Sequence, residues 1–316
     1  MNKNNIIGAV LMAAVFIGYS IYSQPSKEEK AAAARQDSIE NVARKNAENA
    51  AKLAAQQKVA QAQAAAKADT TALFHSALKG KATNVVLKNS SVELTLNTKG
   101  GVVSKAVIKN FTDYNGNSNV TLFDSSSQSL NFALAAKEVN INTADLYFTP
   151  SNQTDSTVTM TATAGDGKEL VINYVLGSDY MLHAKLQTVG MANDFAPSVS
   201  QMDVQWKEMC RQQERGFTFE NRYASLTYHK VDGGTDYLSE AKSITDENIE
   251  KKIDWVAFKN QFFSAVMIAK NNFAENSLMT SVPQEKGSGN LKQYEAKMKT
   301  FFDPSGKTPS EFDFYF

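Results

Sequence analysis

The side chains with the most chemical potential in this chain are three histidines and one cysteine. His75, His183 and His229 lie far apart in the sequence, and none has a second histidine or cysteine ligand close by. Zinc sites usually draw ligand pairs from short spacings, so the sequence predicts no metal site. Cys210 is the only cysteine, which excludes an internal disulfide, and no histidine stands near it to indicate a reactive thiol.

Composition and motif content exclude several classes of function. Lys+Arg and Asp+Glu both number 33, so the net charge is zero and nothing indicates a nucleic-acid partner. The sequence contains no G-x-S-x-G motif, no P-loop and no G-x-G-x-x-G pattern, which are the commonest signals of hydrolases and nucleotide-binding proteins. We therefore predict a protein that is not an enzyme and that uses no cofactor.

The elements that must position these side chains are short β-strands, which begin near residue 82. In residues 92–97 apolar and polar side chains alternate, which is the period of a half-buried strand. Gly100 and Gly101 break this strand before the next one begins. Similar runs follow, separated by turn residues, and residues 115–116 predict a type I′ hairpin turn. Strands at this spacing, without helical periods between them, predict an all-β sandwich or barrel.

The last third of the chain has a mixed pattern. Residues 206–215 are charged and irregular, and residues 239–252 have the composition of a helix. Residues 253–269 predict a strand, a turn and a buried strand, whereas residues 291–302 fit either a strand or a helix. Aromatic residues stand close to arginines in residues 206–228, a pattern typical of protein interfaces and also of core aromatics beside solvated arginines.

The N-terminal segment is apolar and uncharged over residues 6–22. As a helix it would span about 25 Å, near the lower limit for crossing a bilayer core. A cleaved signal peptide fits less well because no small-x-small pair closes the run, and a core helix would show a polar stripe. We predict an uncleaved transmembrane anchor with its N-terminus in the cytoplasm and the remaining chain outside. The anchor residues are Ile6, Val10, Leu11, Val15, Phe16 and Ile17.

A segment rich in alanine, glutamine and lysine separates the anchor from the first strands. Residues 31–69 contain no glycine, proline or aromatic residue, which fits a solvated, partly helical spacer or a disordered linker. We thus predict three parts, an anchor over 1–24, a spacer over 25–81 and a β-sandwich domain over 82–316. The final residues alternate in aromatic side chains, which is unusual for a chain terminus, so we expect the native chain to continue.

Several segments carry a family resemblance through their order along the chain. The apolar span and spacer come first. In residues 97–114 a strand, the glycine pair and a second strand precede an aromatic and an acidic residue. The most specific segment is WVAFKNQFF, which contains Trp255, Phe258, Gln261, Phe262 and Phe263. With residues 312–316 at the end, the chain resembles the N-terminal half of the YidC-type membrane protein insertases of bacteria with two membranes.

The resemblance implies a fold, a role and a location. The fold would be a large twisted β-sandwich of the galactose-mutarotase-like supersandwich type, with minor helix. The role would be to assist the insertion and folding of inner-membrane proteins, with the main domain in the periplasm and one N-terminal span in the bacterial inner membrane. The implied partners are nascent membrane proteins, the Sec translocon and its accessory subunits, and the lipid bilayer. The family's C-terminal membrane bundle has no counterpart in this sequence, so no insertase residue carries over.

The implied fold also raises hypotheses from other classes. A membrane-anchored carbohydrate-binding or mutarotase-like module would pair His183 or His229 with Glu208 or Glu220, because general acid–base chemistry needs such groups to converge. A third hypothesis is a simple spacer domain that only orients the anchor. Fold alone does not decide among these functions, so they stand as alternatives to the insertase role.

Overall fold

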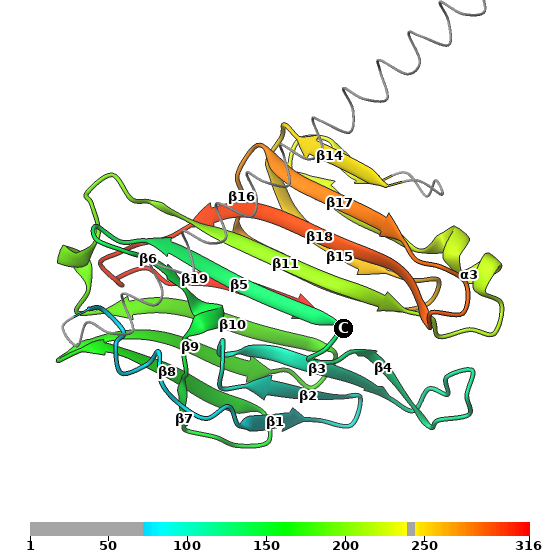
Figure 1. Cartoon of the computed structure of the whole chain (residues 1–316), viewed down its shortest axis with the longest axis horizontal. Helices are drawn as coiled ribbons and strands as arrows, with labels where there is room; N and C mark the ends of the chain where they lie inside the picture. The colour runs from blue at the N-terminus through cyan, green and yellow to red at the C-terminus, as the bar shows by residue number, and fades with distance from the viewer. Residues whose placement is uncertain (1–71, 239–243) are drawn as a thin grey trace, which may run out of the picture. The chain divides into compact units, whose positions relative to one another are not determined.

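The computed structural model describes residues 72–238 and 244–316, and these residues form an all-β architecture (Figure 1). Its 19 strands make two sheets. The helical elements within these residues are α3 (Phe217–Tyr223) and the short 3-10 turns η1 (Thr143–Asp145) and η2 (Ala192–Asp194). The predicted all-β class with minor helix is confirmed.

The predicted membrane anchor falls outside this part of the chain. Ile6, Val10, Leu11, Val15, Phe16 and Ile17 precede residue 72, as does most of the predicted spacer. Within residues 72–238 and 244–316, no helix has the length and apolar character needed to cross a bilayer.

The first sheet contains four strands in chain order, and their sequence pattern explains them. They are β1 (Asn84–Lys88), β2 (Val92–Asn97), β3 (Val102–Lys109) and β4 (Asn119–Phe123). Alternate residues of β2 are buried, because successive side chains of a strand point to opposite faces. The predicted break between β2 and β3 is confirmed at Gly100 and Gly101, whose φ angles are +91° and +68°. Positive φ is cheap for glycine and costly for other residues.

The connection from β3 to β4 differs from the predicted type I′ turn. It spans residues 110–118, and only Gly116 of the predicted pair has a positive φ, +88°. Asp113 organises this loop, because its Oδ1 atom accepts hydrogen bonds from the backbone N–H groups of Asn115 and Asn117, both at 2.9 Å. An aspartate that binds the following backbone stabilises a wider loop in place of the tight turn.

The second sheet contains fifteen strands, paired antiparallel. Its strands are β5 (Gln128–Ala135), β6 (Asn140–Asn142), β7 (Thr149–Ser151), β8 (Thr157–Gly165), β9 (Lys168–Leu176), β10 (Met181–Val189), β11 (Gln201–Arg211), β12 (Ser225–Lys230), β13 (Gly234–Tyr237), β14 (Thr245–Ile249), β15 (Ile253–Lys259), β16 (Ser264–Phe273), β17 (Ser277–Pro283), β18 (Asn290–Phe301) and β19 (Ser310–Tyr315). The main path runs β6-β5-β11-β18-β16-β19-β10-β9-β8-β7. The predicted strand, turn and buried strand over residues 253–269 are confirmed as β15 and β16, and the ambiguous residues 291–302 lie almost entirely in β18.

The segment predicted as irregular, residues 206–215, begins as part of the long strand β11. Every second residue of β11 is buried, and Glu208 occupies one place in this row beside Trp206 and Cys210. The prediction was wrong because a carboxylate interrupts the apolar alternation on which it relied.

The predicted helix over residues 239–252 is wrong for the portion that the structure describes. Residues 245–249 form strand β14, which pairs with β17. Three of its five residues are exposed, so the strand lacks the apolar alternation that would identify it in sequence. Residues 239–243 lie outside the described ranges.

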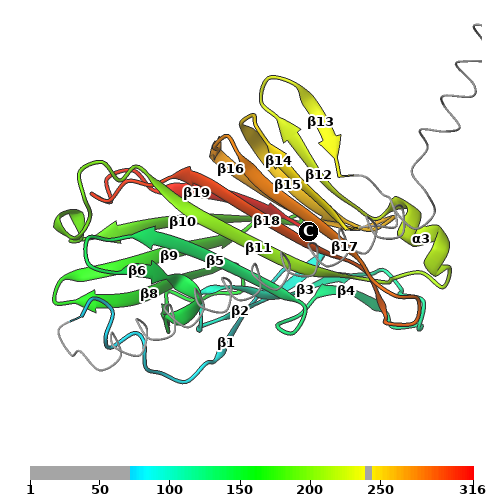
Figure 2. The same ribbon diagram turned by 45° about the horizontal axis from the view of Figure 1, so that its top comes forward.

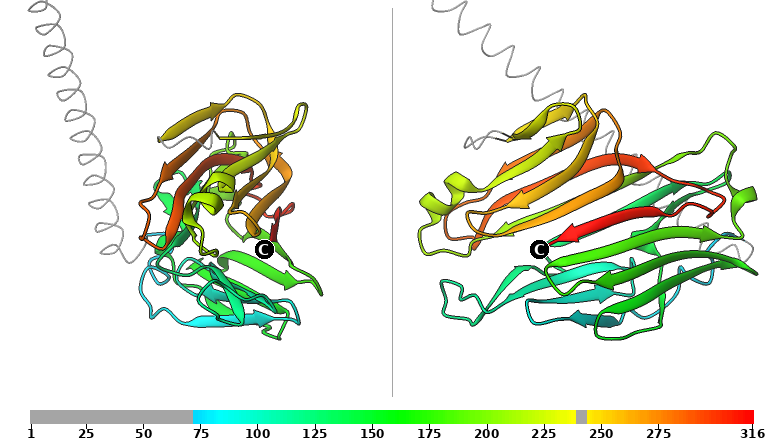
Figure 3. Two further views of the ribbon diagram at one scale, coloured as in Figure 1. Left: turned by 90° about the vertical axis from the view of Figure 1, so that its right-hand side faces the viewer. Right: turned by 180° about the vertical axis from the view of Figure 1, so that it is seen from behind.

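The large sheet curls, as the further orientations show (Figures 2 and 3). Many of the side chains in the core are aromatic. Strand β19 runs through the middle of this sheet and contributes Phe312 and Phe314 to the core. Phe312 packs on Phe132 of β5 with ring centroids 5.2 Å apart. Phe316 packs on Phe123 of β4 at 5.9 Å and so joins the two sheets.

Candidate functional site

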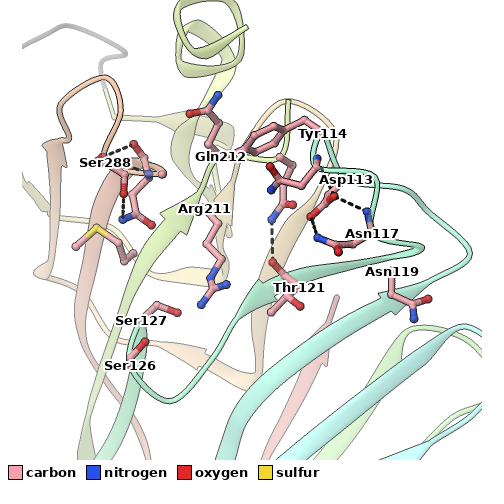
Figure 4. Close-up of a pocket in the computed structure, with 15 residues that line it drawn as sticks. Asp113, Tyr114, Asn117, Asn119, Thr121, Ser126, Ser127, Arg211, Gln212 and Ser288 are labelled. Carbon is pink, nitrogen blue, oxygen red and sulfur yellow. Dashed lines mark hydrogen bonds between the residues drawn. The ribbon is translucent and has the colours of Figure 1, made fainter. Parts of the chain in front are cut away.

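A polar cleft of about 530 Å³ opens between β4 and the end of β11 (Figure 4). Amide and hydroxyl side chains dominate its lining, and they come from the β3–β4 loop, β4, the β4–β5 turn, the end of β11 and the loop before β18. The lining residues that the figure labels are Asp113, Tyr114, Asn117, Asn119, Thr121, Ser126, Ser127, Arg211, Gln212 and Ser288. Such a lining offers many hydrogen-bond donors and acceptors with little net charge.

The guanidinium of Arg211 in this cleft is paired with the carboxylate of Asp124. Burial alone would raise the pKa of Asp124, but hydrogen bonds from Ser126 and the charge of Arg211 lower it to about 2. The two charges offset each other, so the cleft wall presents polar groups rather than a free cation.

An apolar groove of about 550 Å³ lies beyond the same β3–β4 loop, at the end of β19. Aromatic rings line most of it, namely Phe111, Tyr180, Phe262, Phe263, Tyr315 and Phe316. Phe111 and Phe263 meet edge to face with ring centroids 5.6 Å apart. Phe262 is 65% exposed. An exposed aromatic cluster in a groove is typical of interaction surfaces.

The predicted motif from Trp255 to Phe263 divides between the core and this groove. Phe258 is buried, whereas Trp255 lies near the surface, where its ring stacks on His229 at 5.9 Å. Asn260 explains the turn, because its side-chain oxygen accepts hydrogen bonds from the backbone N–H groups of Phe262, at 3.0 Å, and Phe263, at 2.7 Å. That turn places both phenylalanine rings at the groove. Gln261 lies in the same turn and does not line the groove.

The other predicted motif residues, Gly100 and Gly101, lie elsewhere in the fold. They occupy the β2–β3 connection, where Gly101 packs beneath Phe148 and its carbonyl accepts a hydrogen bond of 2.9 Å from the Tyr174 hydroxyl. The structure does not bring the glycine pair into the groove or the cleft, so it acts in packing.

A buried acid lies behind the apolar groove. Glu208 is 3% exposed and lines a small cavity together with Phe263 and Ser264, which also line the groove. Within the described ranges its Oε2 atom has no hydrogen-bond partner. Burial raises the pKa of this carboxyl well above its usual range, and the charge of Arg211 opposes the shift. A carboxyl in this setting favours the neutral form.

The histidines and glutamates of the acid–base hypothesis do not pair with one another. His183 bonds Asp313 through Nδ1 at 2.6 Å, and His229 bonds Asp254 at 2.8 Å. Glu220 accepts hydrogen bonds from the backbone N–H groups of Gln213, at 3.0 Å, and Glu214, at 2.9 Å. Its carboxylate therefore organises a turn. In the part of the chain that the structure describes, each of these two histidines pairs with an aspartate and not with a glutamate. Among the described residues, no group of three His, Cys, Asp or Glu side chains could hold a metal ion.

Sequence reasoning missed the residues that build the polar cleft. The pair of Arg211 with Asp124 joins positions 87 residues apart. Gln213, which is 5% exposed, donates from Nε2 to the backbone carbonyl of Thr121 at 2.8 Å. The one local signal of the cleft was the group of asparagines in residues 115–119, which the sequence analysis interpreted only as part of a turn.

Comparisons with known proteins give a consistent result. Residues 84–316 match the family model described as the YidC periplasmic domain. The chain is 45% identical over 321 residues to the membrane protein insertase YidC of Phocaeicola vulgatus, covering 100% of this chain and 50% of the relative. Identity to the membrane protein insertase YidC of Bacteroides fragilis, strain ATCC 25285, is 39% over 318 residues, covering 100% and 51%. The chain thus spans about half the length of the curated relatives it matches.

Solved structures show a likeness at much lower identity. A galactose mutarotase-like protein from Lactobacillus casei aligns with a TM-score of 0.46 and 11% identity, covering 74% of this chain and 99% of that chain.

Proposed function

The chain belongs to the YidC periplasmic domain family, and from this premise we propose that it is the anchor and periplasmic portion of a membrane protein insertase. Its role is to assist the insertion and folding of inner-membrane proteins, with or without the Sec translocon. The observation that carries the proposal is the 45% identity to a named insertase over 100% of this chain. The alignment includes residues 1–71, which supports a shared N-terminal organisation in addition to a shared β domain.

The proposed placement follows from that organisation. Residues 6–22 form a single N-terminal span in the inner membrane, and the following residues up to 71 act as a spacer. Residues 82–316 lie in the periplasm. The predicted spacer bound at residue 81 is wrong for residues 72–81, because Phe74 and Ala77 are buried in the core of the β domain. The periplasmic domain is non-enzymatic and acts by binding. Its proposed partners are nascent membrane proteins, the Sec translocon with its accessory subunits, and the lipid bilayer beside which the anchor holds it.

Within this domain we assign the apolar groove to the proposed function. It gathers Phe262 and Phe263 from the family-like motif with Phe111 and Phe316. Burial of apolar surface contributes about 25 cal/mol per Å², so an exposed aromatic groove can bind an apolar segment of a client protein.

A replacement experiment tests the function. In cells depleted of the native protein, the gene would be supplied intact or with residues 82–308 exchanged for an unrelated β domain, and the insertion of newly made inner-membrane proteins would be followed by protease protection. We expect the exchange to slow insertion. Equal insertion by both forms would support the simple spacer hypothesis and overturn the role proposed for this domain.

Photo-crosslinking tests the groove. A benzophenone amino acid would replace Phe262 in the membrane-embedded protein, and Leu278 would be the control because it is also an exposed apolar residue, 50% exposed, away from the groove lining. Stalled nascent chains of an inner-membrane protein should crosslink at position 262 and not at 278. Crosslinking at both positions, or at neither, would remove the groove from the proposal.

A further inference from the structure

Strand β4 ends its sheet. The sheet runs β1-β2-β3-β4, and in the part of the chain that the structure describes β4 pairs only with β3. Its outer edge forms one wall of the polar cleft through Asn119 and Thr121. An edge strand presents backbone N–H and C=O groups that another extended chain can bind.

The opposite wall of the cleft is also a strand edge. Strand β11 pairs with β5 from Asp203 to Glu208, but it continues beside β18 to Arg211. Beyond Glu208 the chain of β5 has turned away, and Met209 donates its backbone N–H to Ser127 in that turn at 2.6 Å. The cleft therefore lies between the outer edge of β4 and the short end of β11 after Met209, which has no ladder partner on its cleft side within the described residues.

The side chain of Gln213 already makes one hydrogen bond of the kind that an added strand would make to the edge of β4. The Gln213 amide donates to the Thr121 carbonyl at 2.8 Å, which is the bond that the backbone N–H of an added strand would make. The dashed bond that reaches Thr121 in Figure 4 marks this contact. Thr121 pairs with Val107 of β3 just before the register shifts, and its carbonyl points away from β3. Because both polar groups of a strand residue face the same neighbour, we infer that its N–H also points into the cleft.

We propose that the polar cleft binds an extended polypeptide segment, which adds to the edge of β4 at Thr121 and displaces the Gln213 amide. Backbone hydrogen bonds supply the affinity in this mode of recognition, and alternate side chains supply the specificity. Gln213 acts as an internal competitor, because its amide occupies the Thr121 carbonyl when no segment is bound in the cleft.

The lining decides which segment fits. Asparagine, serine and glutamine side chains surround the edge, and the charge of Arg211 is already matched by Asp124. The carboxylate of Asp113, which also lines the cleft, already accepts hydrogen bonds from Asn115 and Asn117. The occupant is therefore an uncharged hydrophilic segment rather than an apolar or strongly charged one, because unpaired charges and apolar groups would leave these polar groups unsatisfied. Resting on the proposed function, we assign it to the hydrophilic regions of membrane proteins during insertion, which differ from the apolar segments proposed for the groove.

Peptide binding to the full chain in lipid nanodiscs tests the edge directly. The probe is a fluorescent peptide of alternating threonine and glutamine, followed by anisotropy. Thr121→Pro removes the cleft-facing N–H while leaving the β3 side of the strand intact, since proline is tolerated on strand edges. We expect its affinity to fall about tenfold, which corresponds to the loss of one or two backbone hydrogen bonds.

Two further variants test the expected direction of the effect and its location on the sheet. Gln213→Ala removes the competitor and should bind the probe several-fold more tightly. Val86→Pro is the matched control on β1, at the other edge of the same sheet, and should leave binding unchanged. Thermal unfolding identifies any variant that does not fold. In that case the native protein is tested with a second probe that is N-methylated at alternate residues, which should not bind because it lacks the backbone N–H groups. Unchanged or tighter binding by folded Thr121→Pro, unchanged or weaker binding by folded Gln213→Ala, or equal binding of the methylated probe would overturn the proposal.

Crosslinking in membranes separates this proposal from the function on which it rests. A benzophenone at Asn119 should capture hydrophilic segments of stalled nascent chains. If the domain exchange slows insertion but position 119 captures nothing, the cleft assignment fails and the insertase role stands. If the exchange has no effect while the probe still binds with the predicted signs, the insertase role fails and the edge remains a peptide site.

Discussion

Trp206 and Phe258 stack on each other in the core, with ring centroids 4.0 Å apart and planes inclined by 24°. They belong to β11 and β15, which are not neighbours, because β18 and β16 lie between them in the sheet. The contact forms because the sheet curls and brings the buried faces of distant strands together. Such an aromatic pair contributes about 0.5–1.5 kcal/mol beyond the burial of its surface.

Phe258→Ala should therefore destabilise the domain strongly. Loss of a buried phenylalanine leaves a cavity and costs about 3–5 kcal/mol, measured as the free energy of unfolding in urea. Phe262→Ala, four positions along the same motif, should change stability by less than about 0.5 kcal/mol because its ring is exposed. Comparable losses from the two variants would contradict the division of this motif between core and surface.

Gly101→Ala should cost more than Gly116→Ala, although both glycines have positive φ. A Cβ atom on Gly101 would lie 2.9 Å from the Phe148 ring, whereas one on Gly116 would meet nothing within 4 Å. We expect about 2–4 kcal/mol for Gly101→Ala, from backbone strain plus overpacking, and about 1 kcal/mol for Gly116→Ala, from strain alone. Thermal unfolding of both variants measures the difference, and equal costs would place the whole effect in the backbone.

Asp313→Asn should destabilise the outer face of the large sheet. Asp313 is 5% exposed and accepts bonds from both His183 and Lys270. Burial would raise the pKa of Asp313, but these partners lower it below 3.8, so its contribution is present above that pH and is lost as the pH falls. We expect a loss of about 1.5–3 kcal/mol at neutral pH that shrinks below pH 3.8.

The control for that prediction lies on the same strand. Glu311 pairs with Lys185 at 3.0 Å, and the two side chains are 36% and 53% exposed. Glu311→Gln should therefore cost about 0–1 kcal/mol at neutral pH in the same urea titration. A loss equal to that of Asp313→Asn would show that burial of the acceptor is not what matters.

Glu208→Gln should change how stability depends on pH. Burial raises the pKa of Glu208 in the folded protein well above 4.5, the value at which the unfolded chain ionises. Its contribution is then fully present below pH 4.5 and is lost as the pH rises toward the folded-state pKa. Glutamine cannot ionise, so the variant should gain on the native protein by up to about 1.4 kcal/mol per pH unit across that range. Parallel stability curves would contradict the assignment.

Local pattern predicted most of the strands because side chains in a strand alternate between two faces. The hairpin from β8 to β9 follows from such alternation. The pair β15 and β16 follows from two apolar runs that flank the turn at residues 259–261. Prediction failed at β11 and β14, where Glu208 stands in a buried row and where most of β14 is exposed. There the apolar pattern weakens, and pairing with β18 or β17 decides the structure.

The sequence by itself determined the all-β class and the family-like motif from Trp255 to Phe263, because these depend on residues near one another in the chain. Tertiary structure alone decided that His183 bonds Asp313, 130 positions away, and that Gln213 reaches Thr121 across 92 positions. Both contacts depend on strand order and sheet curvature, which are set by strand pairing and core packing across the whole domain rather than by any local segment. A cleft between two strand edges is therefore invisible in sequence, since neither edge carries a local signature of the partner it lacks.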